Sequence, residues 1–293
     1  MISKRTDLAM EARELWQESA GETTKLPGVR ARELRGKGIN TTVVEILDQE
    51  GVRALQKPVG TYVTLELERG LLREPAGFSR AAARLGKEIA RMLPGPGPVL
   101  VAGLGNAAVT PDAIGPRCLD HLVVTRHLGN SFPQLRPVSA IAPGVLGTTG
   151  LESVEVVRGI VERSGPCCVV VVDALASRSL DRVCTTVQLS DTGITPGSGV
   201  GNRRAAFDRQ TLGVPVLAVG VPTVVEANTL LQDVLEENGS KIEKSRTYCD
   251  RSMVVTPKDI DARVQQIARL LGYGVSLGLH RSLRVEDVSC FVG

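Results

Sequence analysis

Residues 167–204 read CCVVVVDALASRSLDRVCTTVQLSDTGITPGSGVGNRR. Residues 167–172 are a continuous apolar run of cysteine and valine, and such a run predicts a strand that is buried on both faces of a sheet. Asp173 ends this predicted strand and begins a stretch rich in glycine, serine and threonine. Ligands and catalytic groups gather at the carboxyl ends of strands in open α/β sheets, so Asp173 is the first candidate for a functional residue.

Strand-like and helix-like patterns alternate on both sides of this run. Apolar, β-branched segments are interleaved with segments of helical spacing from residue 99 to residue 236. This order predicts an α/β fold with a mainly parallel, doubly wound sheet flanked by helices. The predicted strands are 99–102, 138–141, 167–172, 184–189 and 216–219, and the predicted helices lie near 112–126, 151–163 and 224–236.

The segments outside this alternation add a small β element and further helices. Residues 41–47 and 61–67 are rich in β-branched side chains and predict two strands that pair as an antiparallel hairpin. One helix is predicted just before the proline- and glycine-rich stretch 94–98, and another over 257–279 with Thr256 as its N-cap. No repeat or linker divides the chain, so one domain is the simpler interpretation.

The composition excludes several classes of protein. The 293 residues are 42% hydrophobic and can bury a large core. A net charge of only +3 disfavours a DNA-coating protein, so no direct nucleic-acid partner is expected. The N-terminus lacks a signal-peptide core, and no segment approaches the roughly 20 apolar residues of a membrane span. We therefore expect a cytoplasmic protein without a membrane partner, in which the six cysteines are reduced.

A second aspartate, Asp112, lies in a position comparable to that of Asp173. It follows the predicted strand 99–102 by a short loop and opens a predicted helix, so adjacent strand ends could bring the two carboxyl groups together. Two carboxyls held close can divide the roles of acid and base, because their like charges push their pKa values apart. The alternative for Asp112 is structural, since an aspartate near a helix N-terminus most often caps the helix.

Glycine and arginine residues in the same stretch suggest a binding loop. Residues 196–202 contain three glycines, which free the backbone to present consecutive N–H groups to an oxyanion or a substrate backbone. Arginines at its rim would suit acidic peptide side chains. The alternative is a flexible surface turn with solvated arginines. The candidate binding residues are Gly197, Ser198, Gly199, Gly201, Arg178, Arg203 and Arg204.

Several segments together resemble the germination proteases of endospore-forming bacteria. They are RTDLAMEARE at 5–14, GLGNAAVTPDAIGP at 103–116, the stretch 173–204, VGVPTVVEANT at 219–229 and VVTPKDID at 254–261. The resemblance covers most of the chain. It implies an atypical aspartic endopeptidase, in which Asp112 of VTPDAIGP and Asp173 of VVDALASR are the catalytic pair and neither a cofactor nor a metal takes part.

The resemblance also implies what the enzyme acts on and how it is made. The family's substrates are small acid-soluble spore proteins, degraded at germination and cut at a motif of threonine, an acidic residue, a bulky apolar residue and alanine. Thr6-Asp7-Leu8-Ala9 has this form, so the resemblance places autocleavage of a zymogen between Asp7 and Leu8. It implies a propeptide of residues 1–7 and a single α/β peptidase domain of residues 8–293, assembled as a homotetramer in the forespore and spore core.

Other interpretations of the same residues stay open. Residues 103–115 also resemble hydrogenase-maturation endopeptidases, which share this type of fold and bind a metal, yet His121, His127 and His280 all lie outside the predicted strand-end loops. A nucleotide-binding module would explain residues 103–108 as G-x-G-x-x-A, but the next predicted strand ends without the acidic residue that binds a ribose. A relative of the germination proteases without peptidase activity is a further alternative.

The tripeptide Asp191-Thr192-Gly193 matches the catalytic D-T-G of pepsin-like and retroviral aspartic proteases. Those enzymes are β-rich and need a second copy of the tripeptide, whereas this copy lies in an alternating α/β pattern. Asp191 is therefore the third candidate among the carboxylates, after Asp112 and Asp173.

Overall fold

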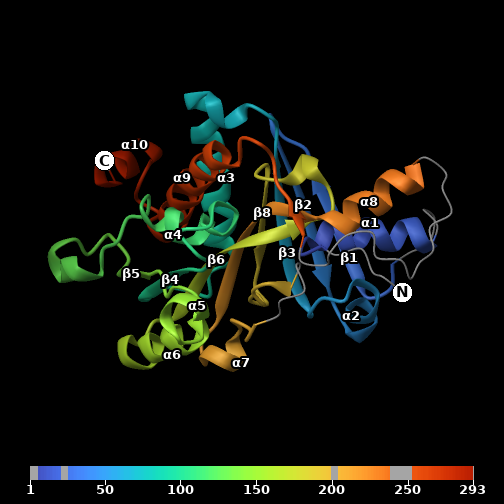
Figure 1. Ribbon diagram of the computed structural model, residues 1–293. Coiled ribbons are helices and arrows are strands. Elements are labelled where there is room, and N and C mark those ends of the chain that lie inside the picture. The colour runs from blue at the N-terminus through green and yellow to red at the C-terminus, as the bar shows by residue number, and fades with distance from the viewer. Residues whose placement is uncertain (1–5, 21–25, 199–203, 238–252, 293) are drawn as a thin grey trace.

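The computed structural model describes residues 6–20, 26–198, 204–237 and 253–292 (Figure 1). Its centre is a nine-stranded sheet in the order β1-β2-β3-β7-β8-β6-β4-β5, with β9 paired to β8 outside this path. The strands are β1 (Val29–Leu34), β2 (Ile39–Ile46), β3 (Gly60–Leu67), β4 (Val99–Gly103), β5 (Val138–Ile141), β6 (Cys168–Ser177), β7 (Thr186–Ser190), β8 (Val216–Glu226) and β9 (Val254–Val255).

The sheet is mixed, so the prediction of a mainly parallel sheet is wrong. Strands β8, β6, β4 and β5 are parallel to one another, whereas β1, β2, β3 and β7 continue the sheet from β8 in antiparallel pairs. The physical reason is the connection after β6. A parallel return needs a crossover of a dozen or more residues, usually a helix, but β6 and β7 are joined by residues 178–185, which hold only the short 3-10 helix Leu180–Arg182.

The predicted hairpin is confirmed and is part of this same sheet. Strands β2 and β3 pair antiparallel in the register Val43↔Val63. Strand β3 then pairs with β7, which joins the hairpin to the parallel strands. The β element predicted as a separate addition is therefore continuous with the central sheet.

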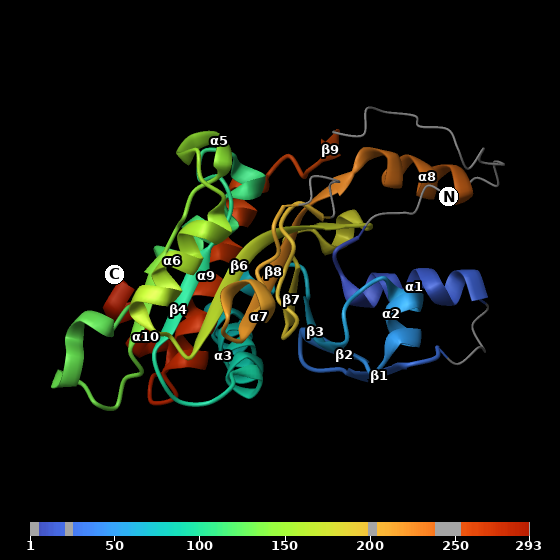
Figure 2. The same ribbon diagram turned by 90° about the horizontal axis from the view of Figure 1, so that it is seen from below.

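Helices cover both faces of the parallel strands (Figure 2). Val170 and Val172 of β6 pack in the core cluster that contains α3 and α9, whereas Val169 and Val171 pack in the cluster that contains α6 and α7. Both faces are thus buried, as the apolar run predicts. The helices are α1 (Ala9–Ala20), α2 (Gln49–Leu55), α3 (Pro75–Met92), α4 (Ile114–Leu119), α5 (Leu146–Thr149), α6 (Ser153–Ser164), α7 (Arg209–Leu212), α8 (Ala227–Glu237), α9 (Ile260–Leu279) and α10 (Val285–Val292).

Three helix boundaries differ from the prediction. Helix α8 begins at Ala227, because residues 224–226, predicted as its start, extend β8. Residues 112–126 do not form one helix: the 3-10 helix Thr110–Asp112 precedes the short α4, and another 3-10 helix covers Arg126–Ser131. The C-terminal helix α9 begins at Ile260 with Asp259 as its N-cap. Thr256, the predicted cap, instead donates its hydroxyl to the carbonyl of Thr223, 3.0 Å away.

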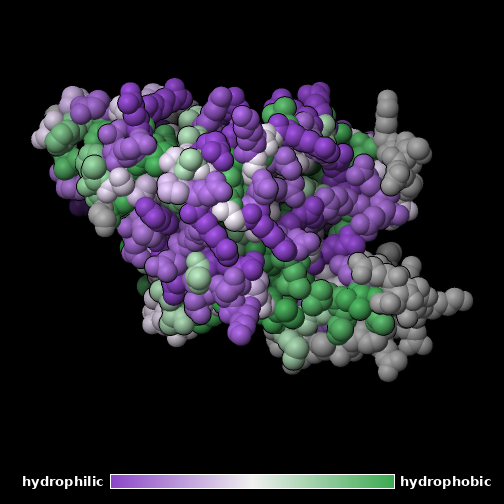
Figure 3. Space-filling model, turned by 90° about the horizontal axis from the view of Figure 1, so that it is seen from above, coloured by the Kyte–Doolittle hydropathy of each residue, from purple (hydrophilic) through white to green (hydrophobic). Residues whose placement is uncertain are grey.

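The face shown in Figure 3 is mostly hydrophilic, with hydrophobic side chains gathered toward the lower right of the view. Three of the large hydrophobic residues that are exposed, Val234, Met253 and Val254, lie in or beside α8 and β9. Within the described ranges, no helix has both the length and the apolar character needed to cross a membrane.

Candidate active site

A cavity of about 490 Å³ lies where β4 stops and its neighbour β6 continues. The last pair between β4 and β6 is Gly103↔Val172, whereas pairing between β6 and β8 runs on to Ser177↔Val225. The edge of β6 that β4 leaves uncovered contributes residues 173–176 to the cavity wall. The site is therefore built at a carboxyl end of the parallel sheet, as expected for an α/β fold.

Asp173 lies inside β6 rather than at its end, because β8 continues to supply hydrogen-bond partners on one side. Its carboxylate is in the cavity lining, and only 4% of the residue is exposed. Oδ1 accepts a hydrogen bond from the main-chain N–H of Ala174 at 2.9 Å. Burial raises the pKa of Asp173 well above its ordinary value, and the negative charge of Asp112 raises it further. Both effects favour the protonated form of the Asp173 carboxyl.

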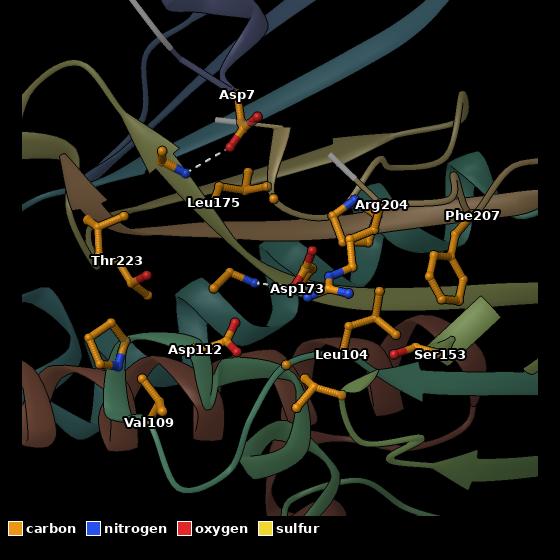
Figure 4. Close-up of a pocket in the computed structure, with 18 of the residues that line it drawn as sticks. Asp7, Leu104, Val109, Asp112, Ser153, Asp173, Leu175, Arg204, Phe207 and Thr223 are labelled. Atoms are coloured by element: carbon orange, nitrogen blue, oxygen red, sulfur yellow. Dashed lines mark hydrogen bonds between the residues drawn. The ribbon is translucent and has the colours of Figure 1, made fainter. Parts of the chain in front are cut away.

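Asp112 reaches the same cavity from the loop after β4 (Figure 4). It is the last residue of the 3-10 helix, and its Oδ2 accepts a hydrogen bond from the N–H of Asn106 at 2.7 Å. Burial raises the pKa of Asp112, whereas the hydrogen bond from the Asn106 N–H and the positive charge of Arg204 act to lower it. Asp112 does not cap a helix, because the N-cap of α4 is Ala113 and no side chain caps that helix. The two carboxyls expected to meet do share one cavity.

The N-terminal segment is bound at the same cavity. Asp7 donates its main-chain N–H to the carbonyl of Ala176 at 3.0 Å, and the N–H of Ala176 donates to Oδ2 of Asp7 at 2.9 Å, as Figure 4 shows. Ser198 donates its hydroxyl to Oδ1 of Asp7 at 2.7 Å. The next residue, Leu8, is fully buried and packs with Leu175. The Thr6-to-Ala9 motif therefore lies beside the pair of aspartates.

The candidate binding residues divide into three groups. Gly197 and Arg204 line the cavity, where Arg204 lies 3.7 Å from the carboxylate of Glu152, and Ser198 holds Asp7. Arg178 is outside the cavity lining and pairs with Glu18 at 2.8 Å and with Asp233 at 3.0 Å. Gly199, Gly201 and Arg203 lie outside the described residues.

The other polar candidates lie away from this cavity. Asp191 is exposed, and its Oδ1 accepts the N–H of Thr61 at 2.8 Å, which holds the start of β3. None of the three histidines belongs to the cavity lining. Across the described ranges, no group of three or more His, Cys, Asp or Glu side chains is arranged to hold a metal. The described cysteines, Cys118, Cys167, Cys168, Cys184 and Cys290, are free, and Cys249 lies outside the described residues.

Comparison with known proteins gives the family of the chain. The family model described as germination protease matches residues 9–245. The chain belongs to the germination protease family. A germination protease of Caldanaerobacter subterraneus subsp. tengcongensis is 43% identical, over 99% of this chain and 98% of the relative. A germination protease of Clostridium tetani is 37% identical, over 99% of this chain and 100% of the relative. One of Bacillus cytotoxicus is 35% identical, over 98% of this chain and 96% of the relative. Family membership makes the chain an endopeptidase with a role in germination.

Two residues beside this site were not expected from the sequence. They line a neighbouring cavity, which shares Asp7 with the cavity of the two aspartates. Lys57 and Gln188 both bind the main-chain carbonyl of Asp7. The sequence could have pointed to Gln188, because it is a polar residue in the middle of the predicted strand TVQLS. It gave no such signal for Lys57, since a lysine in the turn-like sequence QKPVG is typical of an exposed loop. The resemblance to hydrogenase-maturation endopeptidases is not confirmed.

Gly105 determines where Asp112 lies, and we expect Gly105→Ala to lower peptidase activity by about 10²-fold, the effect of displacing a catalytic group by roughly 1 Å. Gly105 has φ +110°, and a Cβ there would lie 1.9 Å from the carbonyl oxygen of Asp112. The matched control is Gly70→Ala, because Gly70 has φ +88° and no atom within 4 Å of an added Cβ. Peptidase activity and Tm are measured for both variants. An equal fall in activity in Gly105→Ala and Gly70→Ala would contradict the prediction.

Proposed function

We propose that the chain is an aspartic endopeptidase that initiates the degradation of small acid-soluble spore proteins during spore germination. The observation that carries the proposal is the pair Asp112 and Asp173 in one cavity, beside a bound segment whose sequence, Thr6-Asp7-Leu8-Ala9, has the form of the family's cleavage motif. Family membership supports the same assignment. Gly197, Ser198 and Arg204 contact the substrate in this proposal, and Gly199, Gly201 and Arg203, which lie outside the described residues, stay candidates for the same role.

The two carboxyl groups have different roles in the proposed reaction. Asp173 is the more deeply buried, and its pKa is raised both by burial and by Asp112, so it holds the proton and acts as the acid. Asp112, the more exposed of the two carboxyls, acts as the base and accepts a proton from the attacking water. The water oxygen bonds to the peptide carbonyl carbon, Asp173 gives its proton to the peptide nitrogen, and the C–N bond breaks. The products are a carboxyl terminus and an amine.

The enzyme is made as a zymogen in this proposal. Residues 1–7 are the leader, residues 8–293 are the peptidase domain, and the enzyme cuts its own chain between Asp7 and Leu8. The hydrogen bonds from Ala176 and Ser198 to Asp7 support an inhibitory leader, because a substrate would need the same groups. Family membership supports a homotetramer that acts in the forespore and spore core.

The proposal is tested by intact mass measurement of the purified wild type, Asp112→Asn and Asp173→Asn proteins after mild acidification, each with a spore-protein substrate and with or without a chelator. Loss of residues 1–7 and substrate cleavage in the wild type alone, unaffected by chelator, are the expected results. Cleavage by either variant at the wild-type rate would remove that aspartate from the mechanism. Loss of activity with chelator would favour a metal-dependent maturation-type endopeptidase.

A further inference from the structure

The carbonyl oxygen of Asp7 accepts two hydrogen bonds from the body of the protein. Nζ of Lys57, in the loop between α2 and β3, donates at 2.9 Å. Nε2 of Gln188, in β7, donates at 3.0 Å. This carbonyl belongs to the peptide bond that joins Asp7 to Leu8. A cationic donor and a neutral donor therefore converge on one oxygen of the bond whose cleavage is proposed above.

The orientation of Gln188 is determined by its second contact. Its Oε1 accepts the main-chain N–H of Ala9 at 2.7 Å, so the amide nitrogen must face the carbonyl of Asp7. Only 7% of Gln188 is exposed. One buried side chain thus binds the main chain on both sides of Leu8, just where α1 begins at Ala9.

The ammonium group of Lys57 is buried against the same segment, although part of the residue reaches the surface. Burial lowers the pKa of Lys57, while the negative charges of Asp7 and Glu11 act in the opposite direction. Burying a lysine is unfavourable unless its charge is compensated. The main-chain carbonyl and the nearby carboxylates supply that compensation when residues 6–11 are bound.

Other groups already hold Asp7 in place without Lys57 and Gln188. Its N–H bonds to the carbonyl of Ala176, and its carboxylate accepts from Ala176 and Ser198. Lys57 and Gln188 add two further donors, and both are aimed at the carbonyl oxygen of Asp7. They are placed where negative charge develops when water attacks a peptide carbonyl, which is the arrangement that most strongly stabilises such an intermediate.

We propose that Lys57 and Gln188 form the oxyanion site of this enzyme, which stabilises the tetrahedral intermediate during hydrolysis of the Asp7–Leu8 bond and of equivalent bonds in acidic substrate peptides. This inference rests on the proposed self-cleavage. As the water oxygen bonds to the carbonyl carbon of Asp7, the carbonyl electron pair moves to the oxygen and is held by the Lys57 ammonium and the Gln188 amide. It returns when the bond to the nitrogen of Leu8 breaks and Asp173 protonates that nitrogen.

The test measures the first-order rate of self-cleavage of full-length chains by intact mass. Lys57→Met and Gln188→Leu are each expected to slow cleavage by about 10²-fold, the usual effect of removing one oxyanion donor. Lys57→Arg keeps the charge and is expected to recover part of the rate. Lys37→Met is the matched control, because Lys37 is exposed, and its rate is expected to equal that of the wild type.

Docking of the segment is measured separately in the Asp173→Asn background. The exchange of the Ala176 amide hydrogen reports docking there, because this amide donates to the Asp7 carboxylate. Adding Lys57→Met or Gln188→Leu to this background is expected to change the protection of that amide by less than about tenfold, well below the expected 10²-fold effect of one oxyanion donor on the rate. A loss of protection as large as the loss of rate would overturn the oxyanion assignment in favour of a docking role.

Two further outcomes separate this inference from the proposed function. If the wild type cuts at Asp7–Leu8 and both Lys57→Met and Gln188→Leu cut at the wild-type rate, the oxyanion assignment fails and the proposed function stands. If the wild type makes no cut at Asp7–Leu8 under any condition that activates it toward substrate, self-cleavage at this bond and the inference built on it both fail.

Discussion

Asp173→Asn is expected to reduce peptidase activity by at least about 10³-fold and, at neutral pH, to make the protein more stable. The loss of activity follows from removing a proton donor or acceptor from the reaction, a role that contributes roughly 10²–10⁴-fold in enzymes. The gain in stability follows from burial, because an ionised Asp173 is unfavourable in a cavity wall where only 4% of the residue is exposed. Asparagine fills the same space without a charge.

The sign of the pH dependence can be worked out from the direction of the pKa shift. The folded chain holds the Asp173 proton at pH values where the unfolded chain, with an aspartate pKa of about 3.9, has released it. The folded state then binds more protons, so its stability falls as pH rises through that window. Asp173→Asn removes this fall, so its Tm is expected to exceed that of the wild type at neutral pH and to converge with it below about pH 4.

Thermal unfolding at several pH values, together with peptidase assays, checks both parts of this prediction. Asp191→Asn is the matched control, since Asp191 is exposed and lies outside the cavity lining. It is expected to keep activity, and its Tm is expected to follow the wild type across the pH range. Equal losses of activity in Asp191→Asn and Asp173→Asn would show that the cavity pair has been assigned wrongly.

The parallel half of the fold could be predicted because its signal is local. The run 167–172 is apolar on every residue, and Val169 to Val172 are buried on alternate faces under two layers of helices. The direction of β7 could not be found in the same way. Strand residues look alike in either direction, and only the short connection 178–185 excludes a parallel return.

The candidate site was predictable in part for a similar reason. Asp112 and Asp173 each follow a strand-like run, so their positions could be placed on one edge of the sheet. Lys57 and Gln188 could not, because their role depends on contacts with Asp7 across 50 and 181 positions of the chain. Nothing in the residues around Lys57 indicates that a segment from the N-terminus will cover it.

Arg182→Met is expected to lower the free energy of unfolding by about 3 kcal/mol, the cost of leaving a buried charge without its ionic partner. Glu11 on α1 is fully buried, and its Oε1 lies 3.0 Å from Nη1 of Arg182. The same guanidinium binds Glu14 at 2.7 Å and Glu66 at 3.3 Å. Methionine fills much of the arginine volume but leaves these carboxylates without their shared cation. A Tm lower by roughly 5 °C would be expected for a chain of this size.

Arg69→Met is the matched control, because Arg69 pairs with Asp181 while both side chains are mostly exposed. Exposed pairs contribute less than about 1 kcal/mol, so its Tm is expected to stay close to the wild-type value. The double variant Arg182→Met with Glu11→Gln is expected to recover part of the lost stability, since it removes the buried charge together with its partner. Equal Tm values for Arg182→Met and Arg69→Met would contradict the prediction.

Glu11 lies on the C-terminal side of the proposed cut and anchors α1 to the body of the protein. Besides Arg182, its carboxylate accepts the N–H of Arg178 at 2.7 Å and of Ser179 at 3.3 Å, so α1 is attached to the end of β6 through residues that follow Leu8. Cleavage between Asp7 and Leu8 would remove the group that occupies the cavity and leave this anchor intact. Arg182→Met should therefore lower the Tm of the cut and uncut chains alike, which unfolding of each form would measure.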